Sequence, residues 1–208
     1  MKLHTYESAP SPRRVHLFLA YKGIELPTRT VDLREHEQWG EDFLRLNPRG
    51  TVPVLELDDG SALSDGIAIC TYLEHLYPER PLMGTGPEQQ ARVLSWHMRI
   101  YMDGFLSCAN ALRNSHPAFA GHADMGPRPC EQIPALAERG KQRLHQFLHD
   151  MDHELANRDF LLGDTFSMAD IDLLVALDFS RRLHLEPETD ISHLNAWRLR
   201  TAHRLDID

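Results

Sequence analysis

The segment Asn47–Leu57 constrains the fold more than any other part of this sequence. Its second half, Val52–Leu57, has the apolar and β-branched residues of a strand, and the Asp59-Gly60 pair that follows favours a tight hairpin turn into a second strand. Pro53 has no backbone N–H, so it fits at the start or the edge of a strand. This leaves the backbone of Val52 available to pair with another extended chain, such as a peptide ligand. A proline that only shapes the strand entry is the alternative.

The composition is that of a folded protein without a basic surface. With 208 residues, of which 42% are hydrophobic and 25% charged, the chain can form one large domain or two small ones. No run approaches the length of about 18 apolar residues that a membrane span needs, and no signal sequence follows Met1, so we expect a cytoplasmic protein without a membrane partner. The net charge of −9 argues against nucleic acid as a partner.

The three cysteines are Cys70, Cys108 and Cys130. They are odd in number, widely separated and include no C-x-x-C pair, so they suggest neither a disulfide framework nor a metal site. We therefore expect reduced thiols and no bound metal.

Strands and helices alternate over residues 1–78. Apolar spacing and turn residues predict a strand over Leu3–Tyr6, then a helix with Ser11 as its N-cap and Gly23 as its end. A strand over Thr28–Leu33 and a loop and short helix over 34–46 follow. The two hairpin strands and a helix from Asp65 to Tyr77 complete the series. The order β-α-β-α-β-β-α predicts a small α/β unit with a mixed sheet.

The rest of the chain is predicted to be helical, after a Pro- and Gly-rich linker over residues 79–90. Apolar residues recur on one face of a long helix: Leu94, Met98, Tyr101, Phe105, Cys108 and Leu112. A loop over 117–134, a helix over 144–155 and a last helix over 194–205 complete an all-α domain over residues 91–208. Between them, Ser167 and Asp170 resemble a capping box at the start of an almost wholly apolar helix.

Four motifs follow one another in an order that is typical of one family: Ser11–Ile24, Asn47–Leu55, Ser64–Glu74 and Phe166–Ile171. In these motifs the chain resembles the cytosolic glutathione transferases, and most of all bacterial members whose first helix opens with Asn-Pro-Arg-Arg-Val. The resemblance implies a thioredoxin-like N-terminal domain, a helical C-terminal domain, glutathione as co-substrate and a homodimer.

The resemblance also implies where glutathione binds. Val52, which precedes a cis Pro53, is expected to pair its backbone with the cysteinyl unit. Asp65 and Gly66 open a helix whose free amides and dipole suit the γ-glutamyl carboxylate, and Gln38 is a further expected contact. The family usually has serine where this chain has Gly66. Because a hydrogen bond to a charged group contributes about 1.5–3 kcal/mol, glutathione is expected to bind less tightly than usual.

Thiol activation has three candidate sources in this sequence. A thiolate is favoured by a helix N-terminus and by a hydroxyl aimed at the sulfur, and Ser11 stands at such a place. Tyr6 and the backbone amides of the first helix are the alternatives, since Ala9 occupies the position where serine-type members carry their hydroxyl. Asp103 is expected to reach glutathione in the partner subunit of a dimer.

Two functions remain open at this point. The first is an enzyme that activates glutathione for attack on a small hydrophobic or electrophilic substrate, a peroxide or a disulfide. The alternative is a non-catalytic interaction or regulatory protein with the same fold, which Ala9 and Gly66 favour.

Overall fold

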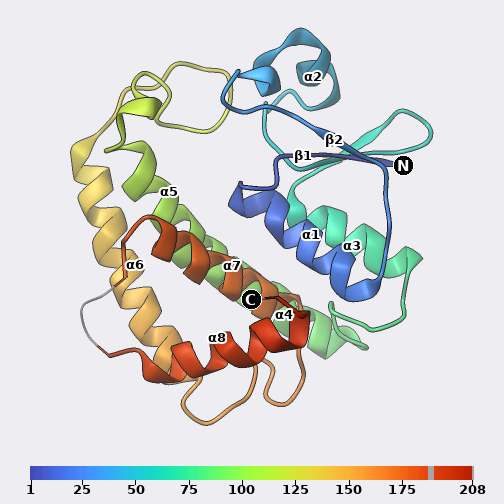
Figure 1. Ribbon diagram of the computed structural model, residues 1–208, viewed down its shortest axis with the longest axis vertical. Helices are drawn as coiled ribbons and strands as arrows, with labels where there is room; N and C mark the ends of the chain where they lie inside the picture. Colours follow the sequence, from blue (N-terminus) through green and yellow to red (C-terminus); the bar gives the residue numbers. More distant parts are fainter. Residues whose placement is uncertain (187–189, 208) are drawn as a thin grey trace. The chain divides into compact units, whose positions relative to one another are not determined.

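A computed structural model describes residues 1–186 and 190–207, which divide into two compact units. The first unit contains Met1–Arg80 together with the segment Asp124–Cys130, and the second contains Pro81–Ala123 and the chain from Glu131 onward (Figure 1). The second unit begins at Pro81, within the stretch predicted as a linker, and its first helix begins at Pro87.

The first unit contains a sheet of four strands in the order β2-β1-β3-β4. Their bounds are Lys2–Thr5 for β1, Thr28–Thr30 for β2, Val54–Glu56 for β3 and Ala62–Ser64 for β4. β1 is parallel to β2 and antiparallel to β3, and β3 is antiparallel to β4. The predicted mixed sheet of a thioredoxin-like domain is confirmed. The predicted strands over 28–33 and 52–57 are both longer than the observed ones.

The strand register brings four connections to one end of this sheet. Thr5 pairs with Thr30, His4 with Val54, and Val54 in turn with Ser64. The segments that leave β1, β2 and β4 and the segment that enters β3 therefore all lie at the same end. The residues of the first unit that are expected to bind glutathione belong to these segments.

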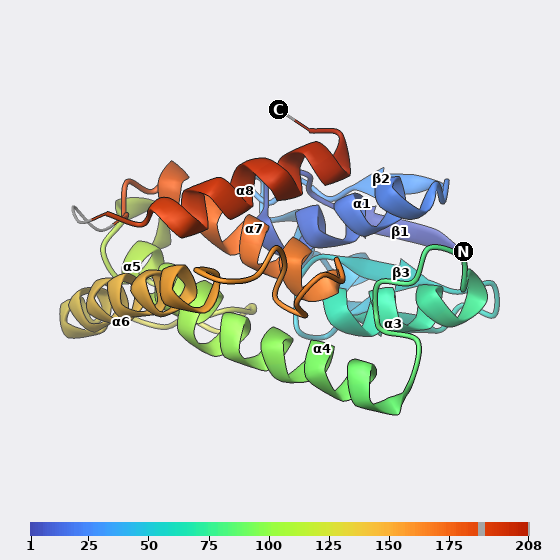
Figure 2. The same ribbon diagram turned by 90° about the horizontal axis from the view of Figure 1, so that it is seen from below.

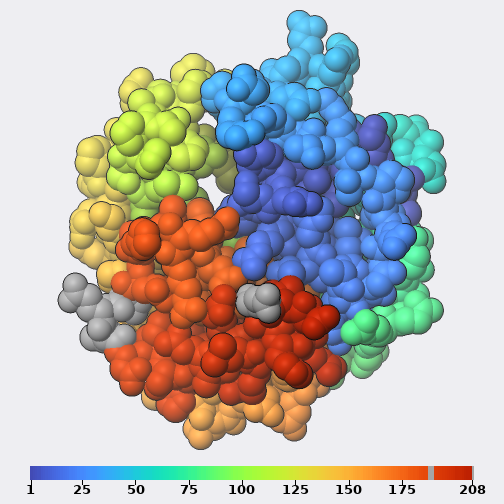
Figure 3. Space-filling view, in the orientation of Figure 1, coloured from blue at the N-terminus to red at the C-terminus, as the bar shows by residue number. Residues whose placement is uncertain are grey.

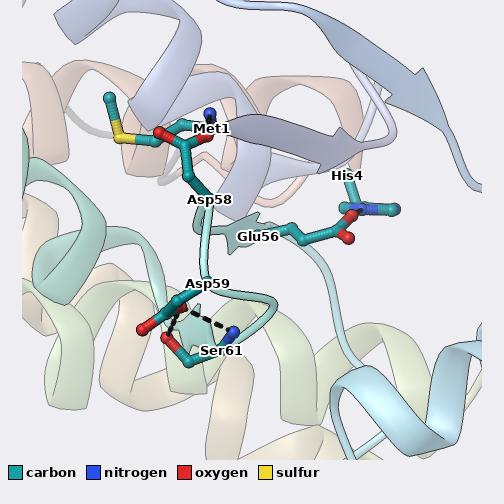
Figure 4. A network of polar contacts seen from close by, with 6 residues as sticks. All are labelled: Met1, His4, Glu56, Asp58, Asp59 and Ser61. Atoms are coloured by element: carbon teal, nitrogen blue, oxygen red, sulfur yellow. Dashed lines mark hydrogen bonds and ion pairs between the residues drawn. The ribbon is translucent and has the colours of Figure 1, made fainter.

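Polar contacts secure the opposite end of β1 and the β3–β4 hairpin (Figure 4). The N-terminal amino group pairs with Asp58, and the Asp59 carboxylate accepts hydrogen bonds from the Ser61 backbone at 2.9 Å and from its hydroxyl at 2.6 Å. Across the sheet, His4 Nε2 lies 2.7 Å from Glu56 Oε2, and this hydrogen bond lowers the pKa of the Glu56 carboxyl. These contacts fix the predicted hairpin.

Helices cover the sheet of the first unit: α1 (Pro10–Lys22), a short 3₁₀ turn η1 (Glu37–Trp39), α2 (Glu41–Leu46) and α3 (Gly66–Leu76). Val54 packs with Phe43 of α2, while the next residue, Leu55, points to the opposite face. α1 and α3 pack against each other (Figure 1), and the buried Lys22 ammonium joins them through a 2.7 Å contact with Glu74.

The start of α1 differs from the prediction. Ala9, in extended conformation, is the N-cap, and Pro10 is the first helical residue. A proline suits this position because its φ is already helical and it has no N–H to leave unbonded. Ser11 therefore lies inside the first turn, and its predicted role as N-cap is wrong. The predicted end at Gly23, where φ is 69°, is confirmed.

The described part of the second unit is helical: α4 (Pro87–Arg99), the π-helical turn η2 (Ile100–Phe105), α5 (Leu106–Arg113), the 3₁₀ turn η3 (Pro117–Phe119), α6 (Pro134–Glu154), α7 (Met168–Arg182) and α8 (Ser192–Leu205). α5 and α6 lie side by side (Figure 1, Figure 2), whereas α8, in red, lies at the surface of its unit (Figure 3). None of the helices described is long and apolar enough to cross a membrane.

The buried face of the long helix is not the predicted one. Leu94 and Met98 are 45% and 55% exposed, while Val93, His97 and Ile100 are buried. The π-helical turn that follows adds residues to a turn and shifts the helix register, so Phe105 and Cys108 are buried as expected. Periodicity alone cannot reveal such a shift.

The buried Asp170 carboxylate organises the region around α7. It accepts hydrogen bonds from Leu161 N at 2.9 Å, Ser167 N at 3.0 Å and Trp197 Nε1 at 3.1 Å, and the Ser167 hydroxyl lies 3.2 Å away. The predicted capping box is confirmed. Burial raises the pKa of the Asp170 carboxyl to about 6, although these hydrogen bonds oppose the rise.

Asp170→Asn tests this burial, because the amide stays neutral at every pH. Since the folded pKa of about 6 lies above the ordinary 3.8, the carboxyl's contribution to stability is full below pH 3.8 and is lost as the pH rises through 6. We expect the stability advantage of the wild type over the variant to be larger at about pH 4 than at about pH 7, by up to about 3 kcal/mol. Urea unfolding of both proteins at both pH values measures this difference in the free energy of unfolding. An advantage that grows toward neutral pH contradicts this account.

Gly140→Ala tests the close packing of α5 and α6. A Cβ at Gly140 would lie 2.7 Å from Ser107 O and 2.9 Å from Ala111 N, which are backbone atoms that cannot turn away. We expect the free energy of unfolding to fall by about 1–3 kcal/mol. Gly86→Ala is the matched control, since a Cβ there meets nothing within 4 Å. Equal melting temperatures for the two variants would show that the helices can separate at no cost.

Candidate functional site

The first turn of α1 offers very few backbone donors. Of residues 10–12, only Ser11 has a backbone N–H, because Pro10 and Pro12 have none, and the next amide, Arg13 N, already bonds to Ala9 O at 3.1 Å. Within the described residues, no acceptor takes the Ser11 amide. An anion at this helix start would therefore meet one backbone amide, that of Ser11.

The Ser11 side chain lies in the same place. Its Oγ accepts a 2.9 Å hydrogen bond from Nη2 of Arg14, a residue only 1% exposed. Tyr6, the alternative candidate, shapes the turn before the helix through its carbonyl, which accepts from Ala9 N at 2.9 Å. Hydroxyl and amide of Ser11 together form the donor pair at the start of α1.

The turn into α3 lies beside the turn into α1. A Cβ at Gly66 would be 3.4 Å from Ser11 O and 3.4 Å from Arg14 Nη2. Asp65, the N-cap, has φ 82° and ψ 130°, which is rare for a residue with a side chain, and its carboxylate accepts from Ile67 N at 3.4 Å. Such backbone strain is concentrated at functional sites. The structure thus brings Ser11 and Gly66 together.

The segment before β3 presents the backbone of Val52. Asn47 closes the preceding turn: its Nδ2 donates to Thr51 O at 2.8 Å, and its Oδ1 accepts from Arg49 N at 3.2 Å. The Val52–Pro53 bond is cis, as the resemblance implied. In the part of the chain that the structure covers, neither N–H nor C=O of Val52 has a hydrogen-bond partner.

Gln38 lies in η1, which follows β2. Its side chain is buried, yet Oε1 meets no donor among the residues described. Gly50 (φ 59°) packs against this turn so closely that a Cβ would lie 2.8 Å from Trp39 Cδ1, so only glycine fits there. The close approach joins η1 to the segment that carries Val52.

Other candidate groups are engaged differently. Asp103, expected to contact glutathione in a partner subunit, forms an ion pair with Arg143 of α6 in its own chain. Burial raises the pKa of the Cys108 thiol to about 12, so this cysteine stays protonated and unreactive. Within the described ranges there is no group of three His, Cys, Asp or Glu residues that could hold a metal ion.

Sequence reasoning missed Arg14 as part of this site. The signal was present, since Arg14 follows Ser11 by three residues and precedes the buried Phe18 by four, which places a charged residue on the inward face of α1. A charge on an inward face needs polar partners and so marks a site.

Comparisons with known proteins identify the family of this chain. Residues 9–76 match the glutathione S-transferase N-terminal domain, and residues 110–204 match the glutathione S-transferase C-terminal domain. Glutathione S-transferase 2 of Saccharomyces cerevisiae is 30% identical over 212 residues, which cover 100% of this chain and 88% of the relative. The chain belongs to the glutathione S-transferase family.

Two solved structures extend the likeness to three dimensions. A glutathione S-transferase domain-containing protein of Marinobacter aquaeolei VT8 has a TM-score of 0.92 at 29% identity, with 100% of both chains covered. A class Gtt2 glutathione S-transferase of Vibrio parahaemolyticus has a TM-score of 0.79 at 27% identity, covering 97% of this chain and 93% of the other. This glutathione S-transferase is an enzyme with glutathione as co-substrate, and its relatives give no support to a non-catalytic role.

Proposed function

We propose that this transferase activates the glutathione thiol with the hydroxyl and the backbone amide of Ser11 and directs the thiolate at a small hydrophobic or electrophilic substrate, a peroxide or a disulfide. The observation that carries the proposal is the start of α1, where the flanking prolines leave the Ser11 amide beside the Ser11 hydroxyl. A thiol has an ordinary pKa of about 8.5 and is mostly protonated at neutral pH. Two donors aimed at the sulfur favour the thiolate.

Other groups of glutathione have candidate partners at the same end of the sheet. The unpaired backbone of Val52 suits a short antiparallel pairing with the cysteinyl unit. The γ-glutamyl carboxylate fits the first amides of α3 beside Asp65 and Gly66, where the helix dipole favours an anion. The buried amide of Gln38 can accept from an N–H of the ligand, or donate to it when turned over. A cytoplasmic location, where thiols stay reduced, remains a prediction.

The experiment that tests the proposal measures binding and turnover separately. We expect glutathione to raise the melting temperature and to be consumed with a small electrophile. An analogue with a methyl group in place of the thiol is the control, since it should bind without turnover. A protein that neither binds millimolar glutathione nor shows a thermal shift contradicts the proposal. Turnover with peroxide or disulfide but not with the electrophile would assign the substrate class.

Gly66→Ser tests the missing hydroxyl. The 3.4 Å spacing around a Cβ at this position is ordinary contact, so a serine fits. Its hydroxyl would donate to the γ-glutamyl carboxylate, and we expect glutathione to bind about tenfold or more tightly. Gly66→Ala adds the Cβ alone and is the control. Calorimetric titration that gives equal Kd values for the two variants would place the carboxylate elsewhere.

We also propose that this enzyme is a homodimer, as members of its family generally are. Leu94, Met98 and Met102 follow one another at four-residue steps along α4 and η2 and are 45%, 55% and 42% exposed. A row of exposed apolar side chains on one helix face is typical of a protein interface.

Met98→Glu tests this interface, because it places a charge in the middle of the row. We expect the wild type to sediment as a dimer and the variant to shift toward monomer. Leu199→Glu is the control, since Leu199 is 67% exposed but belongs to α8. A monomeric wild type, or equal dissociation of both variants, rules out this face as the interface.

A further inference from the structure

The fully buried guanidinium of Arg14 lies between the two turns assigned to glutathione. It donates to Ser11 Oγ at 2.9 Å, and it lies 3.4 Å (Nη2) and 3.6 Å (Cζ) from the place where a Cβ of Gly66 would be. Its side chain comes from the second turn of α1, whose packing leaves the residue 1% exposed. Arg14 is therefore held in place by the core, and its guanidinium contacts both turns from their buried side.

The contact with Arg14 determines what the Ser11 hydroxyl can do. A guanidinium can only donate hydrogen bonds, so Arg14 occupies a lone pair of the Ser11 oxygen and the hydroxyl proton must point away from it. Along the described ranges, no acceptor takes that proton. A charged donor on the oxygen also polarises the O–H bond and strengthens it as a donor.

We infer that Arg14 is a positioning residue for thiol activation: it holds the Ser11 hydroxyl with its proton directed outward, so that this proton is available to the glutathione sulfur. The inference rests on the proposed role of Ser11. In this inference Arg14 acts through Ser11. Such a role differs from two simpler roles that Arg14 could have. A structural arginine would affect folding alone, and a charge acting through space would favour the thiolate whether or not Ser11 has a hydroxyl.

The test compares Arg14→Gln, Ser11→Ala and the double variant with the wild type. Each is titrated for the thiolate of bound glutathione by ultraviolet absorbance, and kcat is followed against pH. Arg14→Gln should raise the pKa of the bound thiol and lower kcat about threefold to tenfold below that pKa, with less than about twofold loss well above it. Arg13→Gln removes the same charge from the neighbouring position of α1 and should change kcat less than about twofold at either pH.

The double variant decides whether Arg14 acts through Ser11. If it does, adding Arg14→Gln to Ser11→Ala brings no further loss, and the two effects fail to add. Fully additive losses, or an Arg14→Gln variant that melts earlier but keeps the wild-type pH profile, overturn the inference. If the Arg14 variant does not fold, Ser11→Ala still decides, because an unchanged pH profile there leaves nothing for Arg14 to position. A wild type that does not bind glutathione overturns the proposed function itself, and the titration shows this first.

Discussion

The register of β1 against its two neighbours is the constraint on which the site depends. β1 is the strand that runs parallel to one neighbour and antiparallel to the other, and this arrangement brings the end of β1 level with the end of β2 and the start of β3. β4, paired antiparallel to β3, ends at the same level. Four loops that are distant in sequence meet there because backbone hydrogen bonds leave no other alignment. A one-residue slip of β3 would turn Val54 away from Phe43 and displace Val52 at the same time.

The two helix starts at this end each lack a hydroxyl that the family commonly provides. Ala9 and Gly66 occupy those positions, and the prolines of α1 remove backbone donors as well. Arg14, buried between the two turns, supplies a permanent positive charge where both losses occur. Arg14 contacts both helix starts, through its hydrogen bond to Ser11 Oγ and its close approach to Gly66, and in our proposal it acts through the Ser11 hydroxyl.

Much of the architecture could be predicted because local signals and tertiary packing agree. The Asp59-Gly60 turn, the end of α1 at Gly23 and the capping box of Ser167 and Asp170 each specify a backbone conformation that no competing interaction changes. The start of α1 could not be predicted correctly, since serine and proline both favour helix starts. Pro10 at the first helical position suits the geometry better than a cap at Ser11, and the helix begins earlier.

For the candidate site, the sequence could predict which backbone positions lie at one end of the sheet but not the side-chain contacts among them. Val52 and Gly66 could be named as candidates because their proposed contacts use the backbone, whose place follows from strand and helix ends. The spacing of Arg14 in α1 indicates an inward-facing charge, but its closeness to Gly66 depends on a distance between α1 and α3 that neither helix specifies alone. The exposed face of α4 was mispredicted for another reason: the π-helical turn η2, which follows α4, changes the helix register between α4 and α5. Neither the distance between two helices nor a change of helix register can be derived from the periodicity of one segment of sequence.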